Sequence, residues 1–148
     1  MVFHEKCLVL LLRVLGSVVC LAFFAMFLPL GWMAAIHSRL GLGTFPDGPI
    51  VEYLTRSLAA MYAIHGGVVL LAATDVRRYA GLIVYLAVAG VLFGIAILVI
   101  DIVSGMPAYW TVGEGPPILV IGAVILWLLR KTLAADGSRS QAPSSATL

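Results

Sequence analysis

Apolar residues along this chain gather in four blocks, and short polar segments separate the blocks. Each block holds about 20 residues, which is the length that an α-helix needs to cross a hydrocarbon core of about 30 Å. The pattern predicts spans at about residues 8–36, 50–74, 79–103 and 116–131. We therefore expect an all-α fold, a four-span transmembrane helical bundle with up-down-up-down topology.

Prolines mark the expected ends of these spans. Pro29 lacks a backbone donor, so it should kink the first span or end its regular part. Pro49, in the sequence Asp-Gly-Pro, is typical of a helix start. The pair Pro116 and Pro117 is expected to open the fourth span in the same way.

The four blocks form one expected membrane domain, residues 1–133. Its first apolar run is about twice as long as the apolar region of a signal peptide, so we expect an uncleaved first span. Residues 134–148 are mostly small and polar and cannot bury enough apolar surface to fold. We expect this segment to be a disordered cytoplasmic tail.

Composition places the chain in the membrane. Its 148 residues are 62% hydrophobic and 11% charged, and the mean hydropathy is +1.11. A soluble domain is about half apolar and one quarter charged, so we expect an integral membrane protein whose main partner is the lipid bilayer. The formal net charge is only +2 and no basic face with interleaved aromatic residues is present, which argues against a nucleic-acid partner.

Basic residues indicate the orientation. Only Arg39 and Arg56 fall on one side of the predicted spans. The others fall on the opposite side: Lys6, Arg13, Arg77, Arg78, Arg130, Lys131 and Arg139. The positive-inside rule then puts the N- and C-termini in the cytoplasm and the loops 37–48 and 104–115 outside a bacterial-type inner membrane. Four aromatic residues would form a belt at the outer interface: Trp32, Tyr53, Tyr109 and Trp110.

The second and third spans carry matching stripes of small and charged residues. In an antiparallel pair, four positions would meet: Arg56 opposite Asp101, Ala60 opposite Ile97, Ala63 opposite Gly94, and Gly67 opposite Gly90. Small residues let helix backbones approach closely, and a charge inside a span is costly unless it is paired. We expect these spans to be the tightest pair, closed at one end by an ion pair.

Arg56 is the first candidate for chemistry. Its partner is either Asp101 or Glu52, which lies one helical turn earlier and has the favourable i, i+4 orientation. The ion pair can be purely structural. Alternatively, it lines an outward-facing pocket in which Arg56 attracts a phosphate or carboxylate and Glu114 adds a second carboxylate to the rim.

His65 is the second candidate, because it lies about midway along the second span. Tyr62 is on a neighbouring part of the same helix face, whereas Arg56 is on the opposite face. A neutral histidine that hydrogen-bonds across helices is one interpretation, and a proton relay or ligand role is the other.

Metal and cofactor chemistry has little support in the sequence. The three histidines lie at different expected depths, no CxxC motif is present, and no nucleotide or hydrolase motif occurs. A mononuclear site built from His37, Asp101 and Glu114 at the outer rim is the one metal arrangement left open. We expect no cofactor and no metal.

The string RSLAAMYAIHGG at residues 56–67, followed by an apolar run, resembles small four-helix bacterial membrane proteins of the DoxX-like type. Much of that group is uncharacterised. The resemblance implies a four-helix membrane bundle and transfers no catalytic residue to this chain.

Three functions are compatible with these residues. The leading hypothesis is a non-enzymatic membrane protein, either an accessory subunit or a homo-oligomer, because the loops are short and no catalytic group of residues converges. The second is a carrier or binding protein for a small or lipid-like anion at the outer face, which uses Arg56 with Tyr62 or Glu114 and requires dimerisation. The third is a membrane enzyme with His65 as base, although no nucleophile is placed near it.

Overall fold

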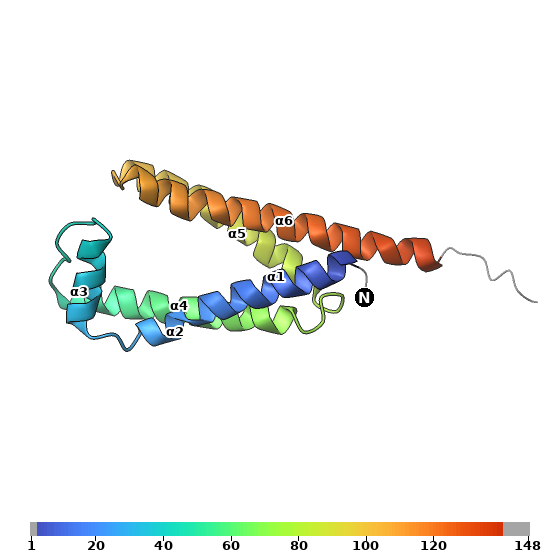
Figure 1. Ribbon diagram of the computed structural model, residues 1–148, viewed down its shortest axis with the longest axis horizontal. Helices are drawn as coiled ribbons and strands as arrows, with labels where there is room; N and C mark the ends of the chain where they lie inside the picture. The colour runs from blue at the N-terminus through green and yellow to red at the C-terminus, as the bar shows by residue number, and fades with distance from the viewer. Residues whose placement is uncertain (1–2, 141–148) are drawn as a thin grey trace, which may run out of the picture. The chain divides into compact units, whose positions relative to one another are not determined.

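The computed structural model describes residues 3–140, with side chains up to residue 135, and over this range it contains helices and no strand. Figure 1 shows how these helices are labelled along the chain. They are α1 (Phe3–Cys20), α2 (Ala22–Ala25), α3 (Leu30–Arg39), α4 (Pro49–Ala72), α5 (Ala80–Val103) and α6 (Ala108–Ser140).

Four helical segments are long and apolar enough to cross a membrane, judged by length and composition. They are Phe3–Ala25, Pro49–Ala72, Ala80–Val103 and Ala108–Ala135. The all-helical fold and the four candidate spans predicted from the hydrophobic pattern are therefore confirmed.

The first predicted span is interrupted, as the position of Pro29 predicts. Regular helix ends with α2, and α3 starts directly after Pro29, whose ψ of 143° lies outside the helical region. Leu28 precedes a proline and is pushed away from helical geometry. The Pro29 carbonyl then accepts the first hydrogen bonds of α3, from the backbone N–H of Trp32 at 2.9 Å and of Met33 at 3.2 Å.

The last helix is longer than the sequence predicts at both ends. It starts at Ala108, because the Pro107 carbonyl accepts the N–H groups of Trp110 and Thr111, and it runs through Pro116 and Pro117 without a break. Prolines are tolerated inside membrane helices, where other groups satisfy the released carbonyls. The helix continues to Ser140, so residues 134–140 are helical rather than disordered, and residues 141–148 of the expected tail lie outside the described residues.

The chain divides into two compact units. The flanking unit contains α1 up to Leu12 and the chain from Ala72 onward, and the central unit contains residues 13–71.

In the flanking unit, α5 and α6 pack closely through glycines. A Cβ on Gly94 would lie 3.1 Å from the Gly115 carbonyl, and a Cβ on Gly122 would lie 3.0 Å from the Ala87 carbonyl. The buried core of this unit lies around the start of α1, the turn before α5, the first part of α5 and the middle of α6. Its buried apolar residues include Leu8, Leu12, Val76, Ile83, Ile125, Leu128 and Leu129.

In the central unit, α1 and α4 approach through Gly16 and Gly66. A Cβ on Gly66 would lie 2.8 Å from the Gly16 carbonyl and 2.7 Å from the backbone nitrogen of Cys20. The Cys20 thiol also donates a weak hydrogen bond to the Ala63 carbonyl at 3.6 Å. Within the same unit, α3 turns away from α2 and runs across the direction of α4 (Figure 1).

Candidate functional site

Arg56 is the centre of a polar cluster in the central unit. Its Nε donates to Glu52 Oε1 at 3.0 Å, and its Nη2 lies 2.8 Å from the same oxygen. Its Nη1 donates to the carbonyl oxygen of Met26, and Nη2 donates to that of Leu28 at 3.2 Å. The predicted i, i+4 pair with Glu52 is confirmed, and the two carbonyl contacts are additional.

The break at Pro29 explains these carbonyl contacts. Helix ends leave carbonyl groups without intrahelical partners, and inside a bilayer no water is present to satisfy them. Met26 and Leu28 lie in the interruption between α2 and α3, so their carbonyls need another donor. The planar guanidinium of Arg56 supplies several N–H groups from the neighbouring α4, which makes it a cap for the broken span.

Asp101, the other expected partner of Arg56, lies near the end of α5 in the flanking unit. It is 5% exposed, and its Oδ2 is buried without a hydrogen-bond partner. Its backbone carbonyl accepts the N–H of Met106 at 2.9 Å and thereby shapes the turn into α6. Because Arg56 belongs to the central unit, the pairing of these two residues remains a prediction.

Glu114 is engaged within its own helix. Trp110, one turn earlier on α6, donates from its indole Nε1 to Glu114 Oε2 at 2.6 Å. This short bond fixes the carboxylate beside the start of α6, and the use of Glu114 together with Arg56 remains a prediction.

The expected seam between the second and third spans joins the two units, and it too remains a prediction. Ala60 and Ala63 are half-buried, and Gly94 has its nearest neighbours on α6, at Gly115 and Leu119. By contrast, a Cβ on Gly67 or on Gly90 would meet no atom within 4 Å.

His65 lies on the exposed side of α4, whereas Tyr62 is half-buried. Three large apolar side chains share the exposed stripe with His65 at a spacing of 4, 3 and 4 residues, and each is more than half exposed. They are Leu54 (57%), Leu58 (52%) and Met61 (67%). We call Leu54, Leu58, Met61 and His65 the α4 stripe.

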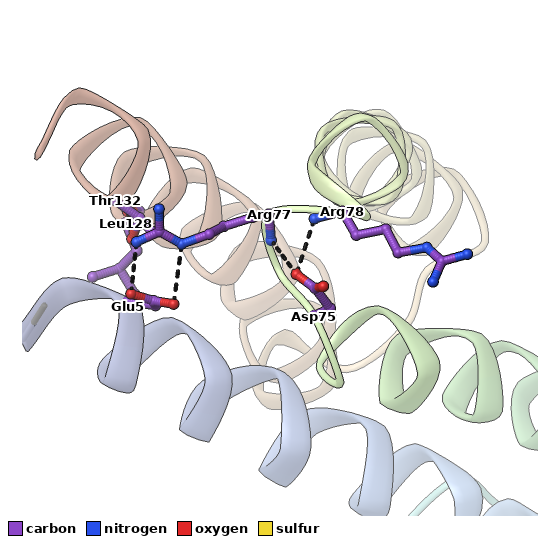
Figure 2. A network of polar contacts seen from close by, with 6 residues as sticks. All are labelled: Glu5, Asp75, Arg77, Arg78, Leu128 and Thr132. Carbon is purple, nitrogen blue, oxygen red and sulfur yellow. Dashed lines mark hydrogen bonds and ion pairs between the residues drawn. The ribbon is translucent and has the colours of Figure 1, made fainter. Parts of the chain in front are cut away.

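The flanking unit contains an ion pair that the sequence analysis did not predict. Arg77 donates from Nη2 to Glu5 Oε2 at 2.9 Å and from Nε to Glu5 Oε1 at 3.3 Å, so the contact is bidentate (Figure 2). Glu5 is only 7% exposed, whereas the Arg77 side chain is 38% exposed. The pair connects the first turns of α1 to the turn before α5.

Asp75 organises the turn that carries Arg77. Its Oδ1 accepts the backbone N–H of Arg77 at 3.2 Å and that of Arg78 at 3.0 Å (Figure 2). The hydrogen bond to Glu5 raises the pKa of Arg77 above its ordinary value, although desolvation acts in the opposite direction. The guanidinium therefore stays charged.

An open pocket of about 730 Å³ lies in the central unit between α3 and the segment that follows it. Its lining includes Gly31, Ala34 and Ser38 from α3, and Gly43, Thr44 and Asp47 from the segment. None of the candidate residues from the sequence lines this pocket.

Residues suited to holding a metal do not gather in the part of the chain that the structure describes, where no three His, Cys, Asp or Glu side chains come together. Cys7 and Cys20 are both free thiols. The polar contacts that the described residues make include capped carbonyls and ion pairs.

Sequence reasoning missed the Glu5–Arg77 pair, although a signal was present. Both residues lie at the ends of predicted spans that face the same side of the membrane, and Glu5 is the one acidic residue before the first apolar block. An acidic and a basic residue at the same depth are candidates for a pair.

Comparisons with known proteins add no relative: no protein-family model, no curated protein and no solved structure matches this chain.

Proposed function

We propose that this chain is a non-enzymatic subunit of a homo-oligomer in the bacterial inner membrane, with both termini in the cytoplasm, and that it assembles through the α4 stripe. The proposal keeps the expected kinship with DoxX-like four-helix proteins. The observation that carries it is the exposure of His65 within α4, seven residues before the end of a helix long and apolar enough to span a membrane.

A polar side chain that faces lipid at this depth is unfavourable, because its nitrogen atoms find no hydrogen-bond partner there. The same side chain is favourable between helices, where it hydrogen-bonds to a partner. Within the central unit, the neighbours of His65 on the stripe are exposed and apolar, so they offer it no hydrogen-bond partner.

A second copy of the chain fits this stripe best. The 4, 3, 4 spacing of the α4 stripe matches the seam along which two helices pack side by side. A neutral imidazole carries one donor and one acceptor nitrogen, so two copies of His65 can satisfy each other across a two-fold axis. A different membrane protein in the same place would make the chain an accessory subunit.

Cysteine cross-linking in native membranes tests the seam. In a Cys7→Ser/Cys20→Ala background, Met61→Cys should form disulfide-linked dimers on mild oxidation. Val88→Cys is the matched control, because Val88 is exposed on α5. Equal cross-linking of the two variants would rule out the α4 stripe as the interface.

The contribution of His65 is measured separately, by the dimer fraction in mild detergent. An interhelical hydrogen bond in a membrane is worth about 1–2 kcal/mol, so His65→Leu should weaken the dimer roughly five- to thirtyfold. A wild-type protein that is extracted only as a monomer, with no partner, would contradict the proposal.

A carrier for a small or lipid-like anion is the second candidate. It is favoured by one observation, the interrupted first span beside Arg56, since transporters place their sites at broken helices. Arg56→Gln should then abolish anion uptake by reconstituted vesicles while Arg39→Gln leaves it intact. Unchanged anion uptake by the Arg56→Gln variant would rule out the carrier function.

A further inference from the structure

Exposed cations gather at one end of the flanking unit. They come from three separate segments: Lys6 from α1, Arg78 from the turn before α5, and Arg130 and Lys131 from α6. We call these four residues the cationic collar.

Three contacts place these segments at the same end. The Glu5–Arg77 pair connects the start of α1 to the turn. The rings of His4 and Trp127 meet edge to face at 5.6 Å, which connects α1 to α6. Figure 2 shows Leu128 and Thr132 of α6 beside Glu5. Each residue of the collar lies within a few residues of a residue that makes one of these contacts.

The acidic groups at this end are used inside the unit. Glu5 is buried and bound by Arg77. Asp75 accepts two backbone N–H groups of its own turn. Asp75 is exposed beside Arg78, so among the side chains described at this end one exposed carboxylate stands against the four cations of the collar, and the exposed charge is positive on balance.

Aromatic residues place the collar at the depth of lipid headgroups. Trp127 is 52% exposed, and the guanidinium of Arg78 lies 5.6 Å from the centre of the Tyr79 ring. Tryptophan and tyrosine favour the interface between hydrocarbon and water, and long cationic side chains there reach toward the headgroups.

We propose that the cationic collar binds the phosphate groups of anionic phospholipids in the leaflet that it faces. Charge complementarity is the argument, since clustered Lys and Arg side chains next to a membrane span attract anionic headgroups. This inference is independent of the α4 stripe and of any oligomer. The chemistry recognised is a phosphate anion, which a lipid headgroup or soluble phosphate supplies.

The test is selective lipid retention by the full chain. The protein is equilibrated in mixed micelles that contain equal amounts of phosphatidylglycerol and phosphatidylcholine, and retained lipid is counted by mass spectrometry. We expect phosphatidylglycerol to be enriched about tenfold, and the enrichment to fall as salt rises. R130Q/K131Q should lose most of it, whereas the matched control R13Q/R39Q, which removes two exposed cations of the central unit, should keep it.

A charge-conserving variant distinguishes loss of charge from misfolding. R130K/K131R should retain the enrichment if charge is the cause. Equal losses in R130Q/K131Q and R13Q/R39Q would overturn the proposal, and so would a wild type without enrichment.

A second experiment adds inorganic phosphate as a competitor. Displacement of the lipid by millimolar phosphate at constant ionic strength would assign the collar to soluble phosphate, and capture of poly-glutamate without lipid enrichment would assign it to an acidic polypeptide. Either result would overturn the lipid assignment.

Discussion

Arg56 donates a hydrogen bond from Nη2 to the carbonyl oxygen of Leu28 at 3.2 Å, across a separation of 28 residues. Leu28 precedes Pro29, where the first span loses its regular helix. A charged residue inside one span thus compensates for a proline in another. The cluster explains why an arginine is tolerated so near an apolar segment, and it makes the structural role of Arg56 testable.

Arg56→Gln should destabilise the protein by about 1–3 kcal/mol, because hydrogen bonds to a charged donor are lost and two partly buried carbonyls are left without that donor. The effect should be smaller in a Pro29→Ala background, where the chain can continue as a helix and satisfy those carbonyls itself. A double-mutant cycle measured by unfolding in mild detergent gives the coupling. Arg39→Gln, at an exposed position on α3, is the matched control. Additive effects of Pro29→Ala and Arg56→Gln would contradict the capping role.

Adjacent glycines on α4 should respond in opposite ways. Gly66→Ala places a Cβ within 2.8 Å of the Gly16 carbonyl, and that backbone atom cannot move without separating α1 from α4. We expect a loss of about 1–3 kcal/mol in unfolding free energy. Gly67→Ala meets no atom within 4 Å and should be neutral or slightly stabilising, because alanine favours helix.

The same pair of variants bears on the predicted seam between the second and third spans. If Gly67 packs against Gly90 when the protein is in a membrane, then Gly67→Ala should be as damaging there as Gly66→Ala. If Gly67→Ala instead keeps its stability and expression in membranes, the predicted contact of Gly67 with Gly90 is wrong. The close backbone contact of α4 is then the one with α1.

Local signals predicted much of the fold. Four apolar blocks predicted four helices long enough to span a membrane, Pro29 predicted the interruption of the first, and Pro49 predicted the start of α4. The Glu52–Arg56 contact was predictable because its residues are one turn apart. Each of these features depends on neighbours in the sequence.

Features that depend on distant neighbours were not predictable in the same way. The chain contains 15 glycines, and spacing alone does not tell which of them meet another helix. Among the described glycines, Gly16, Gly66, Gly94, Gly115 and Gly122 do so, whereas a Cβ on Gly67 or Gly90 would meet no atom within 4 Å. Likewise, Pro107 and Pro116 are both plausible helix starts, and only the hydrogen bonds to the Pro107 carbonyl show that α6 begins there.

Trp32 should lie at the membrane interface rather than in its centre. It is 65% exposed on α3, just beyond the interruption at Pro29, and indole rings favour the headgroup region. In a Trp110→Phe/Trp127→Phe variant, the fluorescence of Trp32 should be quenched more strongly by lipids with a nitroxide near the headgroup than by lipids labelled deep in the chain. The reverse order would mean that α3 continues the first span through the bilayer.

The Glu5–Arg77 pair should show unequal single-variant effects. Arg77→Gln leaves a buried carboxylate without its arginine, whereas Glu5→Gln leaves a guanidinium that is partly exposed and can be hydrated. Arg77→Gln should therefore lower the unfolding midpoint more than Glu5→Gln, and the double variant should lose less than both single variants together. Lys6→Gln, next to Glu5 and exposed, is the control for loss of one charge.

Alkaline pH should not weaken this pair. The pKa of Arg77 is raised, chiefly by its hydrogen bond to Glu5. A basic group whose pKa is higher in the folded state stabilises the fold fully below its unfolded pKa, and this stabilisation is lost only as pH rises through the folded pKa. Arginine stays protonated at about pH 10 even in the unfolded chain, so the coupling between positions 5 and 77 should be the same at about pH 7 and about pH 10. Replacing Arg77 by lysine should introduce a decline only when the measurement is extended above that range, because an unfolded lysine titrates near 10.4 and pairing with Glu5 moves the loss to higher pH. A coupling that falls for the wild-type pair but not for the lysine variant would show that another group controls this contact.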